Sequence, residues 1–139
     1  MGPTFIPILL FHLTNTAIIA EIQRKPPELE CLSDGLRLHF FPESPFCGHI
    51  YVKGFFLSAD CHIDFTSTPF AQPFYFSIPY QGNCNVVRQR SINPSGVMYS
   101  VVVMVQHHYL FLTRSDNSYC LNCFYRDYHS KVTQSLEIG

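Results

Sequence analysis

The chain has 139 residues, a formal net charge of −1 and only 14% charged residues. This charge gives no electrostatic attraction for nucleic acid or for an anionic membrane, both of which are bound through dense clusters of Lys and Arg. Thirteen Phe, eight Tyr and ten Pro, with no sustained helical stripe after Ala20, predict an all-β fold with irregular connections.

The first twenty residues contain no Asp, Glu, Lys or Arg, and their apolar core runs from Phe5 to Leu13. Polar residues interrupt the run, so it falls short of the ~20 consecutive apolar residues of a membrane span. The pattern predicts a secretory signal over residues 1–20, with cleavage after Ala20. A buried helix is the alternative, and Pro3, Pro7 and the abrupt polar change at Glu21 disfavour it.

Short strands with turn signals between them are expected from residue 31 onward. Asp34-Gly35 marks a turn before the alternating strand Leu36–Phe41. Gly54 ends a second strand at His49–Lys53, and the chain then bends toward Cys61. Residues 63–73 read as irregular because they are rich in Thr, Ser and Pro.

The second half of the chain continues the same pattern. Asn93-Pro94-Ser95-Gly96 is a strong turn signal. Val97–Gln106 is the longest apolar run, and its apolar residues on both faces predict a central strand covered on both sides. The remaining expected strands are 74–78, 85–90 and a hairpin of 109–113 with 119–128 around the polar turn 114–118.

About seven short strands at this spacing predict an immunoglobulin-like antiparallel sandwich. We expect one domain over residues 21–128. The polar residues 129–139 are expected to form a linker.

Four segments, read together, resemble the amino-terminal half of a zona pellucida module in the form carried by nematode cuticlins. Cys-X2-Asp-Gly and Arg-Gln-Arg-X-X-Asn-Pro-X-Gly are the sharpest motifs. The resemblance covers roughly residues 28–139. The segments are Glu28–Phe40 (ELECLSDGLRLHF), Pro45–Gly54 (PFCGHIYVKG), Cys84–Gly96 (CNVVRQRSINPSG) and Asp116–Arg126 (DNSYCLNCFYR).

The resemblance implies an immunoglobulin-like half-module that polymerises into extracellular filaments and is followed by a second half. It implies four cysteines paired first to fourth and second to third, which links Cys31 to Cys123 and Cys61 to Cys84. Cys47 and Cys120 depart from the four-cysteine pattern. We expect them to form a third bridge; a bond to a second chain, or exchange of Cys120 with Cys123, stays open.

Redox, zinc-binding and catalytic interpretations of these residues are disfavoured. Cys120-Leu-Asn-Cys123 has the redox CxxC spacing but lies among strand-like residues rather than at a helix start. Cys61-His62, His107-His108 and the CxxC could supply zinc ligands, but adjacent strand residues point apart. No nucleophile or metalloprotease motif is present. We therefore expect no enzyme activity, no cofactor and no metal site.

Two surface features remain. Arg88-Gln-Arg90 is the one basic cluster; a solvated strand face is the favoured interpretation, and a phosphate or glycan contact is the alternative. The aromatic residues exceed what a small core needs, and Phe41, Phe70, Phe74 and Tyr75 are candidates for an exposed self-association patch. The segments expected near that surface are 97–106, 109–128 and 63–78.

The sequence thus predicts a secreted, non-enzymatic structural protein of the cuticle or extracellular matrix. Its expected partners are copies of itself or related modules, through edge-strand pairing and aromatic burial. It is expected to bind no nucleic acid. Membrane tethering is expected only through a carboxy-terminal anchor beyond this chain. The alternative is a secreted immunoglobulin-like binding domain that does not polymerise.

Overall fold

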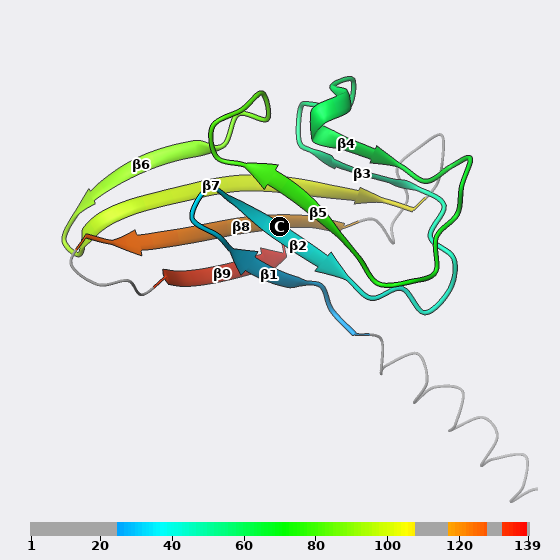
Figure 1. The fold of residues 1–139 in the computed structure, drawn as a ribbon, viewed down its shortest axis with the longest axis horizontal. Helices are drawn as coiled ribbons and strands as arrows, with labels where there is room; N and C mark the ends of the chain where they lie inside the picture. Colours follow the sequence, from blue (N-terminus) through cyan, green and yellow to red (C-terminus); the bar gives the residue numbers. More distant parts are fainter. Residues whose placement is uncertain (1–24, 108–116, 128–131, 139) are drawn as a thin grey trace, which may run out of the picture.

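A computed structural model describes residues 25–107, 117–127 and 132–138 of the chain. The expected leader and the expected strand 109–113 fall outside these ranges. In the described residues the fold is all-β, with one three-residue 3-10 helix (Figure 1). The strands are β1 (Glu28–Cys31), β2 (Gly35–Phe40), β3 (His49–Val52), β4 (His62–Asp64), β5 (Phe74–Pro79), β6 (Val87–Ile92), β7 (Ser95–Gln106), β8 (Asn117–Arg126) and β9 (Val132–Ile138); the helix is η2 (Ala59–Cys61).

The strands form two antiparallel sheets, as the sandwich prediction requires. A three-stranded sheet has the order β1-β2-β5. A six-stranded sheet has the order β4-β3-β7-β8-β9, and β6 joins it by pairing with β7. In Figure 1 the small sheet lies across part of the large sheet, while the β6–β7 hairpin extends to the left beyond it.

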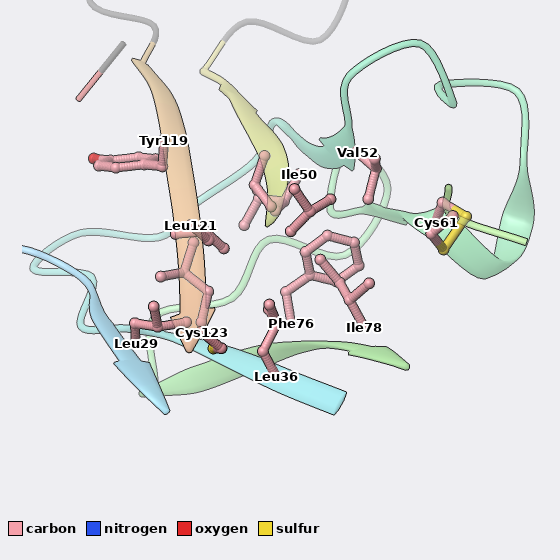
Figure 2. Close-up of a cluster of buried hydrophobic side chains, with 14 of the residues drawn as sticks. Leu29, Leu36, Ile50, Val52, Cys61, Phe76, Ile78, Tyr119, Leu121 and Cys123 are labelled. Atoms are coloured by element: carbon pink, nitrogen blue, oxygen red, sulfur yellow. A yellow bond between two sulfur atoms is a disulfide. The ribbon is translucent and has the colours of Figure 1, made fainter. Parts of the chain in front are cut away.

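The core lies where the two sheets overlap. The small sheet contributes Leu36, Leu38 and Ile78, each 0% exposed, and the large sheet contributes side chains such as Ile50 and Leu121. Figure 2 shows Leu36 and Ile78 of the small sheet on one side of this core and Ile50 and Leu121 of the large sheet on the other. Each fully buried aliphatic side chain of this size stabilises the fold by about 1.5–3 kcal/mol.

The longest strand, β7, is covered along only part of its length. From Val101 onward its side chains alternate between buried and half-buried, while from Ser95 to Ser100 only Gly96 is buried. The expectation of a strand covered on both sides is therefore wrong. The small sheet covers one face of the second half of β7, and the apolar sequence of the strand does not reveal which part is covered.

The segment expected to be a linker carries strand β9 instead. It pairs with β8 from Tyr119↔Ile138 to Tyr125↔Val132, and most of its side chains are exposed. Backbone hydrogen bonds rather than burial hold β9, so its polar sequence lacks the usual alternating signal of a strand. The sandwich in the structure therefore runs beyond residue 128.

Two smaller expectations change, and a third is confirmed. Residues 63–73 are not wholly irregular, because β4 pairs with β3. The strand expected at 85–90 is β6, two residues later. The bend at Gly54 is present, with a positive φ of 87° that favours glycine, and the chain then enters turns and η2.

Candidate association surfaces

Two disulfides hold the sandwich together. Cys31 of β1 is bonded to Cys123 of β8, which joins the two sheets with a Cα–Cα distance of 5.9 Å. Cys61 at the end of η2 is bonded to Cys84 in the loop before β6, with a Cα–Cα distance of 5.5 Å. These are the two pairs that the resemblance implies. The inter-sheet bond closes a loop of 92 residues, which contributes about 4–5 kcal/mol in the chain-entropy model.

The third bridge expected between Cys47 and Cys120 is not formed, and both residues carry free thiols. Gly48, next to Cys47, packs on the carbonyl of Gln106 at one end of β7. Cys120 pairs with Val102 on the opposite side of β7. Gln106 and Val102, the β7 residues next to Gly48 and Cys120, are four residues apart, which is about 13 Å along the strand. This distance is far beyond the ~4.4–6.8 Å that separates the Cα atoms of bonded cysteines. Sequence spacing carried no information about this offset.

Three tyrosines pack and form hydrogen bonds beside the disulfide that joins the two sheets. Tyr80 and Tyr99 stack with ring centroids 3.9 Å apart. Tyr125 donates its hydroxyl hydrogen to the carbonyl of Leu32, beside Cys31, so Tyr80 must donate to Tyr125. Burial raises the pKa of both Tyr80 and Tyr125 above the usual value. The cluster therefore stays protonated and ties the turn after β1 to β8.

A second aromatic cluster lies at the other end of the sandwich. Phe65 contacts Phe46 edge-on and Phe74 at a tilt, with ring centroids 5.6 and 4.8 Å apart. Phe74 also stacks on Phe40, with ring centroids 5.1 Å apart. The backbones of Phe46 and Phe70 form an isolated antiparallel β-bridge. These rings join β2, β5 and the loop of residues 41–48, and they are arranged in the offset geometries that aromatic pairs prefer.

Beside this cluster lies an apolar groove of about 190 Å³. We call it the aromatic groove. Its walls come from the end of β2, the loop after it, and the adjoining ends of β5, β7 and β8. Because these segments are far apart in the sequence, no sequence motif could have predicted the groove. Its main apolar lining residues are Phe40, Phe41, Pro42, Pro45, Phe46 and Phe74.

The four aromatic residues predicted for a surface patch have different surroundings. Phe70 and Tyr75 are exposed, at 38% and 48%. Phe41 and Phe74 are half-buried and line the aromatic groove. Lys25 also covers Phe41, with its ammonium 3.9 Å from the ring centroid. The structure thus brings Phe41 and Phe74 together in one groove, next to Phe70, whereas Tyr75 stacks under Arg37 on the outer sheet face.

The longest strand is central in its sheet, as its sequence predicted, so the unpaired edges belong to other strands. β7 lies inside the large sheet, with β8 on one side and β3 and β6 on the other. It therefore offers no free edge for pairing with another chain. The edges of the large sheet belong to β4, β6 and β9. Arg88 and Arg90 lie on β6, and charged residues on an edge disfavour pairing between like edges.

Of the histidines considered for the disfavoured zinc site, His62 has a structural role, and His108 lies outside the described residues. His62 donates from Nδ1 to the carbonyl of Phe56, so its Nε2 accepts from Nδ1 of the buried His49 at 2.7 Å. This pair fixes the turn before η2 on β3. Across residues 25–107, 117–127 and 132–138, no group of three or more His, Cys, Asp or Glu side chains could hold a metal ion.

The CxxC spacing also has a structural explanation. Cys123 is bonded to Cys31, and Cys120 is a half-buried thiol on the opposite face of β8. The two cysteines are therefore not a redox pair. In the part of the chain that the structure describes, no helix has the length and apolar character to cross a membrane.

A sandwich of two antiparallel sheets held by two disulfides is typical of extracellular β modules. Comparison with known proteins makes the class specific. The family model described as the cuticlin N-terminal domain matches residues 26–125, so the chain belongs to the cuticlin N-terminal domain family. The resemblance noted in the sequence is thereby confirmed.

Related proteins support the same family. The chain is 35% identical to Cuticlin-1 of Caenorhabditis elegans over 113 residues, which cover 81% of this chain and 26% of that protein. It is 35% identical to Cuticlin-3 over 113 residues, covering 81% and 28%, and 28% identical to Cuticlin-6 over 127 residues, covering 91% and 22%. The chain thus spans about a quarter of the length of these relatives. No solved structure matches it.

Proposed function

We propose that this chain is a self-associating structural module of the cuticle, a specialised extracellular matrix. At the family level, cuticlins are structural components of the cuticle rather than enzymes. The observation that carries the proposal is the match of the cuticlin N-terminal domain to residues 26–125. It is supported by the two disulfides, which are typical of proteins in oxidising compartments.

The mechanism we propose has a rigid part and an adhesive part. The inter-sheet disulfide and the tyrosine cluster keep each subunit in one shape, so association costs little conformational entropy. The adhesive part consists of the unpaired edge strands of the large sheet (β4, β6 and β9) and the aromatic end of the molecule. At that end Phe70 is exposed beside the aromatic groove. The partners are copies of this chain or related modules.

Sedimentation velocity of the secreted chain over a range of concentrations tests the proposal. We expect species larger than the monomer to grow with concentration. Replacing Phe70 by Ser should reduce them, because burial of this ring contributes to association. Leu57→Ser is the matched control, since Leu57 is 97% exposed on the turn before η2, away from the aromatic groove. A chain that stays monomeric at every concentration would instead support the non-polymerising binding domain.

A further inference from the structure

The two ends of strand β7 carry different surface features, an exposed apolar side chain at one end and a groove at the other. At its start, the β6–β7 hairpin ends in a narrow tip, where Ile92 is 90% exposed and is followed by Asn93-Pro94. At its far end, Val105 and His107 border the aromatic groove. The twelve residues of β7 place the tip and the groove about 36 Å apart. Figure 1 shows the two ends of β7 at the left and the right of the large sheet. The tip of one molecule therefore cannot reach its own groove.

The groove is suited to a single large apolar side chain. Its volume of about 190 Å³ corresponds to about six waters, at ~30 Å³ each. Waters against rings and prolines find few hydrogen-bond partners, so an apolar side chain that displaces them gains free energy. The hairpin tip presents one such side chain, because the neighbours of Ile92 are the polar residues Ser91 and Asn93.

Charge distinguishes the hairpin tip from Leu57, which at 97% is the other apolar side chain of the described residues with an exposed fraction as high as that of Ile92. Glu43 is exposed and lines the groove, and Lys25, which also lines it, is paired with Glu28 at 3.5 Å. Arg126 is exposed at the hairpin end, where it pairs with Gly96. Within the described residues, neither Glu43 nor Arg126 forms an ion pair. Leu57, by contrast, lies near the acidic Asp60 of η2, which would face Glu43 with like charge.

We infer that the Ile92 tip of one copy of this chain docks in the aromatic groove of the next copy, with Arg126 facing Glu43 across the rim. This inference rests on the proposed function and specifies its geometry. Because two different surfaces meet, the contact is not self-complementary. Such heterologous contacts repeat along a line and form an open filament unless the rotation between copies closes a ring.

Disulfide trapping with the native Cys47 tests this docking directly. Cys47 is an exposed thiol that lines the aromatic groove, so a cysteine at position 92 of a docked copy would lie near it. In a Cys120→Ser background, Ile92→Cys should form a ladder of dimers, trimers and longer chains on mild oxidation, visible on a non-reducing gel. Val87→Cys is the matched control, because Val87 is 54% exposed on the same strand but five residues from Ile92. It should give at least fivefold less product.

Adding Cys47→Ser to the Ile92→Cys variant should abolish the ladder, because the groove thiol is then gone. Equal yields from positions 92 and 87 would overturn the inference. So would a product that stops at the dimer, which indicates a closed pair rather than an open chain.

A charge swap provides a second measurement without a new cysteine. Glu43→Arg and Arg126→Glu should each lower assembly of the otherwise unaltered chain several-fold in low salt, and the double variant should restore it. If the unaltered chain assembles but neither the swap nor the trap has an effect, the docking geometry is wrong and the proposed function stands. If the unaltered chain does not assemble at all, both fall.

Discussion

The two halves of strand β7 have similar sequences and different surroundings. Val103 and Val105 in the second half are buried beneath the small sheet, at 0% and 5% exposed. Val97 and Met98 in the first half are only half-buried, because that half pairs with β6 beyond the overlap of the sheets. We call the second half the core half and the first half, with β6, the arm. Coverage by the small sheet, rather than the apolar character of the strand, therefore decides which half of β7 contributes more to stability.

The largest expected effect concerns the disulfide between the two sheets, Cys31–Cys123, at the border of the two halves, where Cys123 pairs with Tyr99 of β7. Cys123→Ala removes the inter-sheet bond, and the free energy of unfolding should fall by about 4–5 kcal/mol because the unfolded chain regains the entropy of a long loop. Denaturant unfolding followed by tyrosine fluorescence measures this change. Cys120→Ser, on the opposite face of the same strand, is the control and should change stability by less than about 1 kcal/mol. Similar losses of unfolding free energy in both variants would contradict a special role for the disulfide between the sheets.

A matched pair of substitutions compares the two halves of β7 directly. Val103→Ala removes two methyl groups from a fully buried site and should cost about 2–3 kcal/mol in stability. Val97→Ala makes the same change in the arm, where the side chain is half-exposed, and should cost less than about 1 kcal/mol. Urea unfolding of both variants gives the difference. Equal costs would mean that the arm is packed as tightly as the core.

The tyrosine cluster at the border of the two halves predicts a response to alkaline pH. Burial raises the pKa of Tyr80 and Tyr125, so the folded state holds these protons more tightly than the unfolded chain, whose tyrosines titrate at 10.0. The contribution to stability is therefore complete below pH 10 and is lost as the pH rises above it. Ultraviolet titration should show Tyr80 and Tyr125 ionising only as the chain unfolds.

Tyr125→Phe should flatten this alkaline dependence and should also cost about 1–2 kcal/mol at neutral pH, since the Leu32 carbonyl loses its donor. Two-state unfolding at several pH values separates the two effects. An unchanged alkaline midpoint in the variant would show that other groups govern the transition.

The smallest expected effect lies in the arm. Arg90 forms an ion pair with Asp127 at 2.6 Å, and both side chains are partly exposed. Arg90→Ala should lower stability by about 0.2–1 kcal/mol, and added salt should reduce the difference because the pair is screened. Arg88→Ala on the same strand is the control. A loss above about 2 kcal/mol would show that the arm contributes more than its exposure suggests.

Much of the framework could be predicted from residues near one another in sequence. The alternation in Leu36–Phe41 predicted β2, and Asn93-Pro94 predicted the turn between β6 and β7. Such signals succeed because turn residues and period-two burial act over a few residues. The pairs Cys31–Cys123 and Cys61–Cys84 came from the family resemblance, since spacing by itself left the pairing open.

The errors have a common physical cause. β9 was missed because an exposed edge strand needs backbone partners rather than an apolar pattern. The Cys47–Cys120 bridge failed because register places the two residues at different levels of the sheet. The aromatic groove could not be predicted from the sequence, because its walls come from segments separated by up to about a hundred residues.

The sequence by itself determined the all-β class, the family and most of the strands, because local residue preferences and motif order suffice for these. Only the tertiary structure decided which half of β7 is buried, which thiols remain free and which apolar side chains form a groove at one end with an exposed Ile92 at the other. Those properties depend on how the two sheets overlap, and that overlap is set by long-range packing rather than by any single segment.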